Sequence, residues 1–323
     1  MNAGATSWDV VVVGGGAAGL SAALVLGRSR RRVLVLDDGH PRNAASGHVQ
    51  GYLTRDGATP SDLLEAGRDE VRRYGVQIRT GRAESLLPES APGWIDVRLR
   101  DGTTERARRV VVATGLRDEL PDVPGLAERW GRDVLHCPYC HGWEVRDEPL
   151  VVIATTATDA TKAVTMTQWS RTITLLLDGV DRGDLAPQDR ARLDALGVAV
   201  LTGTVCALDV DEGDALAGVT LSDGRSLPCS AVVVQPRVVA QDALLVEVGA
   251  EVATGPFGEF VVTDVTGATG VPGIWATGNV TEPAAQVVMA AAAGYRAALA
   301  IDHDLILEDA DRAVERARAR QPR

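Results

Sequence analysis

Short apolar runs recur along the chain, and polar or glycine-containing stretches separate them. Three of these runs are continuous stretches of Val, Leu and Ile, at residues 10–13, 33–36 and 150–153. Runs of this kind are typical of strands buried on both faces of a parallel sheet. Residues 94–115 and 205–236 instead alternate apolar and polar positions around an Asp-Gly pair, which predicts antiparallel strands with one polar face.

A glycine-rich turn follows the first apolar run. Gly14, Gly16 and Gly19 form a GxGxxG pattern between the predicted strand and an Ala- and Leu-rich segment that predicts a helix. The first glycine permits a tight turn, the second lets a pyrophosphate approach the backbone, and the third brings the helix onto the strand. Asp37 ends the next apolar run, eighteen residues after Gly19, where an acid would bind ribose hydroxyls. This segment therefore predicts a dinucleotide site.

The same pattern occurs twice in the chain. DGxxxxxxxVVVATG, from residue 101, matches DGxxxxxxAVVVQP, from residue 223. Upstream of the second match, the apolar run at 150–153 enters a turn and then a helix-compatible segment at 159–169. An internal duplication of this kind predicts an α/β fold with two Rossmann-like units, each with three layers of the ββα type.

The second copy lacks the glycines of the first turn. Ala154, Thr156 and Asp159 stand at the corresponding positions. A β-branched Thr hinders close backbone approach, and a carboxylate at residue 159 would repel a pyrophosphate. We therefore expect the second unit to be kept as structure but lost as a dinucleotide site. A shifted alignment or an unusual NADPH loop is the alternative interpretation.

The last third of the chain returns to strand and helix patterns. Residues 261–264 and 271–279 are the next strand-like segments, and the second of them reads VPGIWATGN. An Ala-rich helix is expected from about Gln286 to Ile301, and its positive N-terminal end would favour an anion. Residues 308–320 are expected to form a charged helix or a frayed tail with a solvated face.

Composition narrows the class of protein. The 323 residues allow two domains and a core large enough for a cofactor. The net charge of −11 disfavours nucleic acid, because residues 30–32 are the one short basic stripe. No run approaches the roughly 20 apolar residues of a membrane-spanning helix. No basic and apolar leader precedes the first glycine cluster, so we expect a cytoplasmic protein.

A pair of cysteines carries the second candidate chemistry. The segment His136-Cys137-Pro138-Tyr139-Cys140-His141 contains a CxxC with histidines on both sides. An imidazole beside a thiol lowers the pKa of that thiol or moves its proton, which suits thiol–disulfide exchange. Haem attachment through CxxCH, a zinc site and a merely structural pair are the alternatives, and no metal is expected. Cys206 and Cys229 fall in strand-like segments and are expected to be small core residues.

In their order and spacing, the glycine turn, the ATG segment, the CxxC and VPGIWATGN resemble the low-molecular-weight thioredoxin reductase family. The resemblance implies an FAD domain formed by residues 1–118 and 245–323, a central domain at 119–244 inserted into it, and a homodimer. It implies that Cys137 and Cys140 form the redox pair. The residues that it implies around FAD are Gly14, Gly16, Ala17, Ala18, Gly19, Asp37, Asp38, Arg42, Asn43, His48, Ala113, Thr114, Gly115, Gly278, Asn279, Gln286 and Val287.

Three departures from the family pattern point to a subfamily. Residues 175–179 read LLLDG where the family has a basic motif for NADPH, His141 replaces an acid, and Asn279 replaces an aspartate. A CxxCH dithiol beside FAD without a nicotinamide site resembles the dithiol oxidases of gliotoxin and holomycin type, which close disulfides in small natural products.

This resemblance predicts a mechanism in which a small dithiol attacks Cys137 while Cys140 faces FAD. O2 would then accept the electrons and yield H2O2. His141 would be the base, with His136 as a secondary candidate.

Two other functions stay open at this point. The first is a reductase of a thioredoxin-like protein, fed by NADPH or ferredoxin, which would run the same dithiol in the opposite direction. The second is a flavin-binding redox sensor without turnover. The direction of electron flow depends on the potentials of partners that the sequence does not contain.

Overall fold

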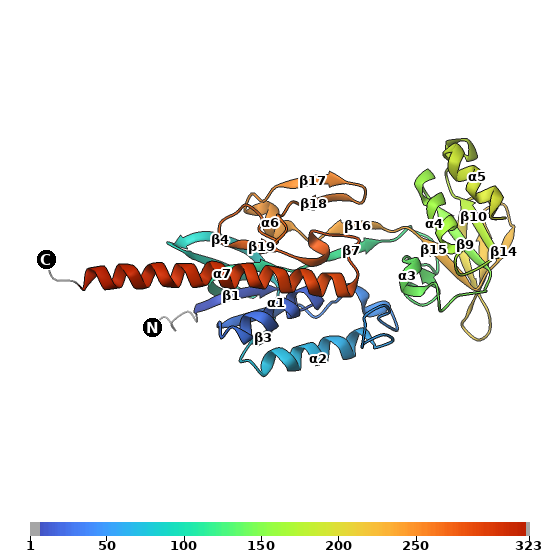
Figure 1. Cartoon of the computed structure of the whole chain (residues 1–323). Coiled ribbons are helices and arrows are strands. Elements are labelled where there is room, and N and C mark those ends of the chain that lie inside the picture. Colours follow the sequence, from blue (N-terminus) through green and yellow to red (C-terminus); the bar gives the residue numbers. More distant parts are fainter. Residues whose placement is uncertain (1–6, 321–323) are drawn as a thin grey trace. The chain divides into compact units, whose positions relative to one another are not determined.

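The computed structural model describes residues 7–320, and the chain in it forms two compact units. Unit 1 contains residues 7–42, 61–117 and 238–320, and unit 2 contains residues 43–60 and 118–237. Figure 1 colours the chain along its length, so the blue and red ends can be followed within unit 1. Unit 2 therefore includes a segment, 43–60, that lies far from its main part in the sequence.

A seven-stranded sheet forms the centre of unit 1. Its order is β3-β2-β1-β6-β5-β4, with β19 pairing to β6. The parallel strands are β1 (Ser7–Val13), β2 (Val33–Asp37), β3 (Gln77–Thr80), β6 (Thr104–Val112) and β19 (Ile274–Ala276). The antiparallel strands are β4 (Ala83–Ala91) and β5 (Trp94–Leu99). The strands that were predicted as continuous and as alternating runs are thus confirmed.

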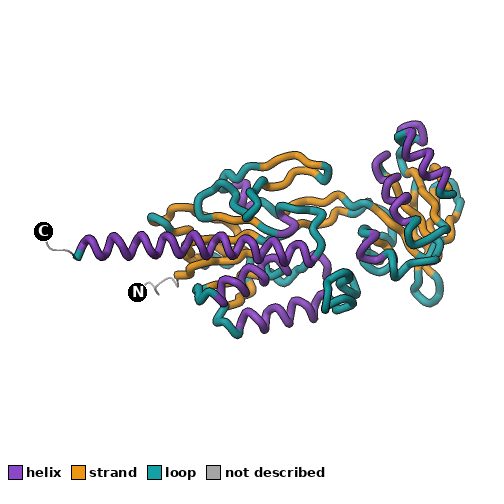
Figure 2. The backbone as a smooth tube through the Cα atoms, viewed as in Figure 1, coloured by secondary structure: helices purple, strands orange, loops and turns teal. Residues whose placement is uncertain are grey.

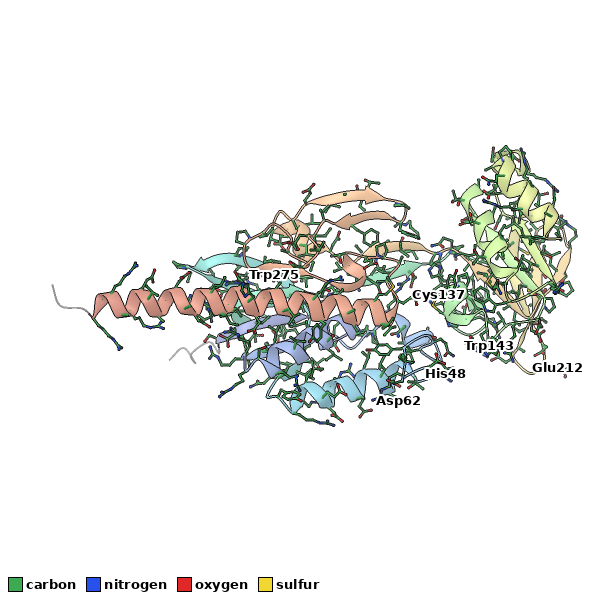
Figure 3. All side chains as sticks on the ribbon, viewed as in Figure 1. His48, Asp62, Cys137, Trp143, Glu212 and Trp275 are labelled. Atoms are coloured by element: carbon green, nitrogen blue, oxygen red, sulfur yellow. A yellow bond between two sulfur atoms is a disulfide. The ribbon has the colours of Figure 1, made fainter. Side chains whose placement is uncertain are left out.

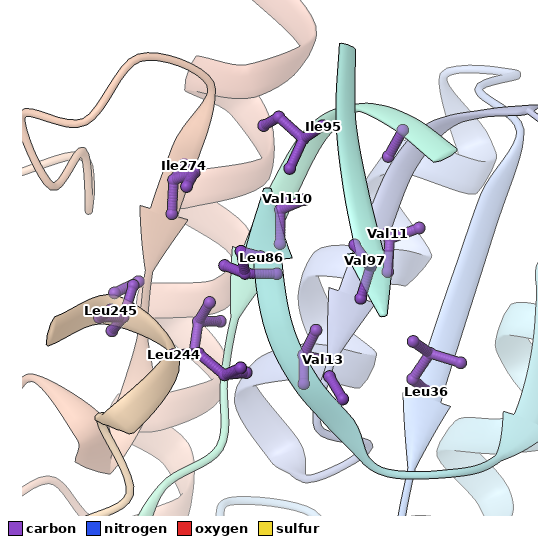
Figure 4. Close-up of a cluster of buried hydrophobic side chains, with 14 of the residues drawn as sticks. Val11, Val13, Leu36, Leu86, Ile95, Val97, Val110, Leu244, Leu245 and Ile274 are labelled. Atoms are coloured by element: carbon purple, nitrogen blue, oxygen red, sulfur yellow. The ribbon is translucent and has the colours of Figure 1, made fainter. Parts of the chain in front are cut away.

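Both faces of this sheet are covered, which explains the unbroken valine run of β1. Val10 and Val12 pack in one buried cluster with side chains of α1 (Ala17–Arg28) and α7 (Val287–Ala319). Val11 and Val13 point the other way, into a cluster with β5 and the short helix α6 (Ala243–Glu247), as Figure 4 shows. Helix α2 (Pro60–Arg72) and the hairpin of β17 (Val252–Gly255) with β18 (Gly258–Val261) complete unit 1.

Helix α7 continues without a break from Val287 to Ala319, so the charged segment is a helix and not a frayed tail (Figure 2). Residues 313–320 are exposed as expected, but Glu308 and Asp309 before them are partly buried. Arg108, which is 6% exposed, contacts Glu308 at 3.2 Å and Asp309 at 2.7 Å. Arg31 reaches Asp302 at 2.6 Å as well as Asp309. Acids on one face of the helix therefore pair with arginines of unit 1, and the expectation of a solvated face was wrong for these positions.

Unit 2 repeats the parallel arrangement, which confirms the predicted duplication and the two Rossmann-like units. Its larger sheet has the order β11-β10-β9-β15-β8, and all its pairings are parallel. A three-stranded antiparallel sheet, β12-β13-β14, lies in the same unit. The strands are β8 (Val134–Leu135), β9 (Leu150–Ala154), β10 (Ile173–Leu177), β11 (Ala199–Thr202), β12 (Val205–Val210), β13 (Leu216–Leu221), β14 (Ser226–Pro228) and β15 (Ala231–Val234).

Three helices belong to unit 2: α3 (Pro138–His141), α4 (Ala160–Met166) and α5 (Pro187–Ala195). Strand β7 (Leu116–Glu119) leads out of unit 1 and pairs with β16 (Arg237–Ala240), which leads back. Cys229 is buried as expected, but Cys206 is exposed, so the expectation of a core residue was wrong there. No helix within residues 7–320 has the length and apolar character needed to cross a membrane.

Candidate active site

The first glycine turn in unit 1 has no room for a side chain at Gly14 or Gly19. Gly14 has φ +108°, and a Cβ there would lie 2.3 Å from the carbonyl oxygen of Ala113. A Cβ at Gly19 would lie 1.9 Å from the carbonyl oxygen of Gly14. A Cβ at Gly16, in contrast, meets no atom within 4 Å. The turn is therefore packed tightly against the sheet and open at its middle glycine, where a phosphate group would approach.

The start of α1 fits an anion. Gly16 is the N-cap and has no side chain that could bind the first amides of α1, and the first turn contains no acid. The free N–H groups of a helix start favour a phosphate. Asp37 lies beside this turn, because a Cβ at Gly15 would lie 2.6 Å from its carboxylate, and Arg68 of α2 contacts Asp37 at 3.2 Å. The residues present thus fit the pyrophosphate and ribose of a dinucleotide.

Two other sequence segments meet this turn. Ala113 touches Gly14, and a Cβ at Gly278 would lie 2.8 Å from the Cβ of Ala18. Thr114 donates its hydroxyl proton to the Gln241 carbonyl at 2.6 Å, and the Gln241 amide donates to the Thr114 carbonyl at 2.8 Å. This contact of Gln241 was not predicted. These contacts bring the ATG and ATGN segments together within unit 1.

Asn279 shapes the loop before α7. Its side-chain nitrogen donates to the carbonyl oxygens of Glu282 at 2.9 Å and Ala285 at 3.0 Å. An aspartate could not donate these bonds, so the substitution has a structural reason. Gln286 is the N-cap of α7, and the first turn of that helix has no acid. The start of α7 therefore has no side-chain cap, and the residues near it are Gly278, Asn279, Gln286 and Val287.

The second turn, in unit 2, is filled by its own side chain. The carboxylate of Asp159 accepts hydrogen bonds from the backbone N–H of Thr155 at 3.1 Å and of Thr156 at 2.9 Å. Asp159 is only 7% exposed. These are the amides that a dinucleotide phosphate would need in a turn of this kind. Asp178 follows β10, where the sequence lacks a basic motif, and lies 3.5 Å from the Val205 amide.

The CxxC segment lies at α3 of unit 2, and Cys137 and Cys140 form a disulfide (Figure 3). Cys137 is the N-cap, and its sulfur accepts a hydrogen bond from the Cys140 N–H at 3.2 Å. An amide donor of this kind stabilises a thiolate when the disulfide opens. Tyr139 and Trp143 flank the pair and are 77% and 65% exposed. No group of three or more metal-ligating side chains occurs among the described residues.

A cavity of about 300 Å³ lies beside the disulfide within unit 2. Cys140 and His141 form part of its wall, and the opposite part comes from the segment 43–60. Ser46 lies 3.2 Å from Nε2 of His141, and Gln50 donates to the Glu144 carboxylate at 2.9 Å. The other residues around the cavity are Ala45, Gly47, His48, Gly131, Arg132, Leu135 and Val145.

His141 is placed as a neutral base. The Ser46 hydroxyl donates to the His48 carbonyl at 2.9 Å, so its oxygen accepts from Nε2–H of His141. Nδ1 is buried and makes no hydrogen bond that meets the geometric limits within residues 7–320. Burial lowers the pKa of His141 below its usual 6.5, although Glu144 and the Cys137 carbonyl act to raise it. His141 is therefore expected to be neutral at neutral pH, the state in which an imidazole can act as a base.

The other flanking histidine, His136, contacts a lysine. The ammonium of Lys162, on α4, lies 3.3 Å from Nδ1 of His136 and 2.6 Å from the side-chain oxygen of Gln235. Burial lowers the pKa of Lys162 to about 8, although Asp159 acts to raise it. Lys162 was not predicted as a site residue, because a lysine on a helix is ordinarily a surface residue.

The structure divides the predicted flavin residues between the units. Asn43 and His48 belong to unit 2, where His48 lines the cavity at Cys140. Asp38 is exposed after β2, and Arg42 begins the short turn Arg42–Ala45. The remaining predicted flavin residues all lie in unit 1. Ser46 was missed, because only the fold brings it to His141.

Comparison with known proteins assigns the chain to a family. Residues 8–294 match a family described as pyridine nucleotide-disulphide oxidoreductase. The crystal structure of HlmI has a TM-score of 0.91 and 48% sequence identity, covering 97% of each chain. A protein named thioredoxin reductase sirT from Leptosphaeria maculans is 32% identical, covering 94% of this chain and 95% of that one. A probable thioredoxin reductase from Arthroderma benhamiae is 38% identical over 151 residues, which is 37% of its length.

These findings confirm the predicted resemblance to thioredoxin reductases and identify an enzyme of the disulfide oxidoreductase type, with Cys137–Cys140 as its disulfide. The chain belongs to the pyridine nucleotide-disulphide oxidoreductase family.

Proposed function

We propose that the protein is an FAD-dependent oxidase that closes an intramolecular disulfide in a small dithiol and passes the electrons to O2. Bond formation balances as one dithiol plus one O2 giving one cyclic disulfide plus one H2O2. The similarity to HlmI and to proteins named thioredoxin reductase supports a dithiol reaction. The direction of that reaction rests on the two glycine-type turns.

The observation that carries the proposal is the occupied second turn. Asp159 takes the Thr155 and Thr156 amides, while the first turn is open at Gly16. These contacts support FAD binding in unit 1 and argue against a pyridine nucleotide in unit 2. Without a nicotinamide donor, we expect the electrons to enter through the dithiol itself.

The residues of unit 2 carry the exchange step. The substrate loses a thiol proton to His141, which lines the cavity, and its thiolate attacks the sulfur of Cys137. The Cys137–Cys140 bond breaks, and Cys140 leaves as a thiolate. His141 passes the first proton to solvent and takes the proton of the second substrate thiol. The resulting thiolate attacks the substrate sulfur of the mixed disulfide, which releases the cyclic product and the Cys137 thiolate. The amide of Cys140 stabilises that thiolate.

FAD, when bound, would accept the electron pair of the reduced dithiol and hand it to O2. The first glycine turn with Asp37, the Ala113–Gly115 segment and the uncapped start of α7 would hold it. The positive end of α7 favours negative charge near Gln286 and Val287. The cavity beside Cys140 has the size of a small-molecule site.

An anaerobic absorbance experiment tests this function. The purified flavoprotein is mixed first with NADPH and then, separately, with a small dithiol such as dithiothreitol. We expect bleaching of the flavin by the dithiol alone, with recovery and H2O2 after air is admitted. Rapid bleaching by NADPH would favour a reductase, and bleaching without sustained O2 consumption would favour a redox sensor.

Cys140→Ser tests the role of the disulfide. We expect this variant to stay yellow and to lose dithiol oxidation, because no disulfide can receive the substrate thiolate. Cys206→Ser is the matched control, since Cys206 is an exposed free thiol in the same unit. Dithiol oxidation by Cys140→Ser near the rate of the unmodified protein would refute the assignment.

A further inference from the structure

The chain contains a single lysine. Lys and Arg together number 33, and Lys162 is the one lysine among them. The other 32 of these 33 basic residues are arginines. Arginine cannot release its proton in proteins, whereas lysine does so readily when it is buried. A site that keeps lysine in such a chain is a candidate for proton transfer.

Lys162 lies on α4, directly after the second copy of the nucleotide-type turn, among residues that differ from the first copy. Its neighbours Asp159 and Gln235 correspond to Gly19 and Ala113 of the first copy, and Lys162 itself corresponds to Ala22. The ammonium contacts Gln235 at 2.6 Å and the Val234 carbonyl at 3.4 Å. The replacements in the second copy thus form one polar cluster in place of a coenzyme site.

This cluster contacts the histidine that directly precedes the dithiol in the sequence. Nζ of Lys162 lies 3.3 Å from Nδ1 of His136, which directly precedes Cys137. An ammonium can only donate, so Nδ1 accepts and the neutral ring carries its proton on Nε2. Lys162 therefore fixes the tautomer of a histidine next to the cysteine that receives the substrate.

We propose that Lys162 is a positioning residue that supplies a proton, through His136, to the Cys137 thiolate released with the product. In this step His136 gives its Nε2 proton to the Cys137 sulfur and takes a proton from Lys162 at Nδ1. Lys162 becomes a neutral amine, and solvent later returns its proton. No electrons move in the step, and one N–H bond of Lys162 is exchanged for one S–H bond. The inference rests on the proposed exchange at Cys137.

The surroundings leave few other groups that could control Lys162. Strands β9 and β10, beneath α4, carry no titratable side chain. Asp159 is the acid that acts on the ammonium, and burial opposes it, which brings the pKa of Lys162 to about 8. Helix α3 brings the dithiol and His141. Helix α5 carries Asp189, Arg190, Arg192 and Asp194, of which Asp189 pairs with Arg192.

The test uses the single lysine as a probe. Flavoprotein labelled with 13C-lysine gives one lysine side-chain signal, which is titrated by NMR with the dithiol oxidised and then reduced chemically under anaerobic conditions. We expect a midpoint near 8 when oxidised. We expect a higher midpoint when reduced, because a nearby thiolate favours the ammonium. An identical midpoint in both states would overturn the proposal.

Control variants show whether a change in the Lys162 midpoint comes from the dithiol or from the flavin. In Cys137→Ser no disulfide forms, so a midpoint change that persists there comes from the flavin and counts against the proposal. His136→Gln removes the imidazole between Lys162 and Cys137, and we expect the change in the Lys162 midpoint to disappear. Because these measurements use a chemical reductant, they stay informative even if the protein does not oxidise small dithiols.

Kinetics distinguish proton supply from charge. We expect Lys162→Gln and Lys162→Arg both to slow product release by at least about tenfold, as part of the roughly 10²–10⁴-fold effect of a positioned proton-transfer group. Full activity of Lys162→Arg would show that charge alone suffices and would overturn the proton step. Circular dichroism verifies the fold of both variants, and the titration of the unmodified protein needs no variant.

Discussion

Asp159 shows how one side chain can change the chemistry of a loop while keeping its shape. Its carboxylate binds the amides of Thr155 and Thr156, as an anionic ligand would. The helix-like turn after β9 is thereby satisfied without a bound molecule. A buried acid at this place is a stabilising element as well as a barrier to phosphate.

Asp159→Ala is expected to destabilise unit 2 without creating a coenzyme site. Loss of a capping carboxylate costs about 0.5–2 kcal/mol of the free energy of unfolding, which urea denaturation measures. NADPH should still fail to bleach the flavin of the variant, because Thr156 crowds the turn. Asp181→Ala, at another turn of unit 2 where the side chain makes no capping bond, is the matched control. Bleaching by NADPH would contradict this prediction.

His141 is expected to set the acid limb of the pH profile. Since burial lowers its pKa, the ring stays neutral as the pH falls through 6.5 and becomes protonated only below that value. The rate of dithiol oxidation should therefore persist below pH 6.5 and fall at lower pH. Glu144 and Cys140 of its own segment, Arg132, and His48 of the segment 43–60 are the titratable groups around the same cavity.

Variants distinguish the contribution of His141 to the pH dependence from that of the neighbouring titratable groups. His141→Gln should remove the acid limb and lower the rate by roughly 10²–10⁴-fold, the contribution of a positioned base. Ser46→Ala should reduce the fall of the oxidation rate at acid pH. Ser46→Thr keeps the hydroxyl and should show the same fall as the unmodified protein. Ser226→Ala is a matched control elsewhere in unit 2. An unchanged limb in His141→Gln would assign the proton to another group.

At the scale of elements, the packing of α1 against α7 depends on a close approach of their backbones. A Cβ at Gly294 of α7 would lie 2.0 Å from the carbonyl oxygen of Ala18 on α1. The same contact brings the start of α7 toward the first glycine turn, because Gly278 also meets Ala18. The packing of the two helices thus keeps the predicted flavin residues of α1 close to those before α7.

Gly294→Val is expected to force α7 away from α1. Overpacking of this kind costs about 1–3 kcal/mol, so calorimetry should show a lower melting temperature. The variant should also retain less flavin after purification. Gly183→Val, at a position with no atom within 4 Å of a Cβ, is the control for adding a valine side chain. A normal melting temperature and flavin content would mean that the helices tolerate separation.

At the scale of the whole molecule, α7 carries a stripe of exposed apolar side chains. Val288, Tyr295, Leu299 and Ile306 are 41–52% exposed and recur at intervals of seven and four residues, which places them on one face of the helix. An exposed apolar stripe of this length is typical of a protein interface. It supports the homodimer that the family resemblance implies.

The double variant Leu299→Glu with Ile306→Glu is expected to be monomeric, since two buried carboxylates would have no partner in a dimer. Light scattering at micromolar concentration measures the mass. Leu196→Glu is the control, because Leu196 is an exposed leucine of unit 2. A dimeric double variant would place the interface elsewhere.

The sequence predicted most of the architecture, because strand runs, glycine turns and the CxxC are local patterns. The continuous α7 was not predicted. Its acids were expected to face solvent, because the arginines that pair with them, Arg31 and Arg108, lie far away in the sequence. The association of residues 43–60 with unit 2 was missed for the same reason: it depends on Gly131, where a Cβ would lie 2.5 Å from the Ala45 carbonyl. Contacts between distant segments leave no periodic signal.

The carboxylate held in the second turn has a consequence for the cell. A loop that carries its own counter-ion can mature without any pyridine coenzyme, so the supply and redox balance of the nicotinamide pool would exert no control over this protein. Under the proposed oxidase function, its working rate would follow the availability of thiol substrate and oxygen, which would separate the pathway that it serves from central reductive metabolism.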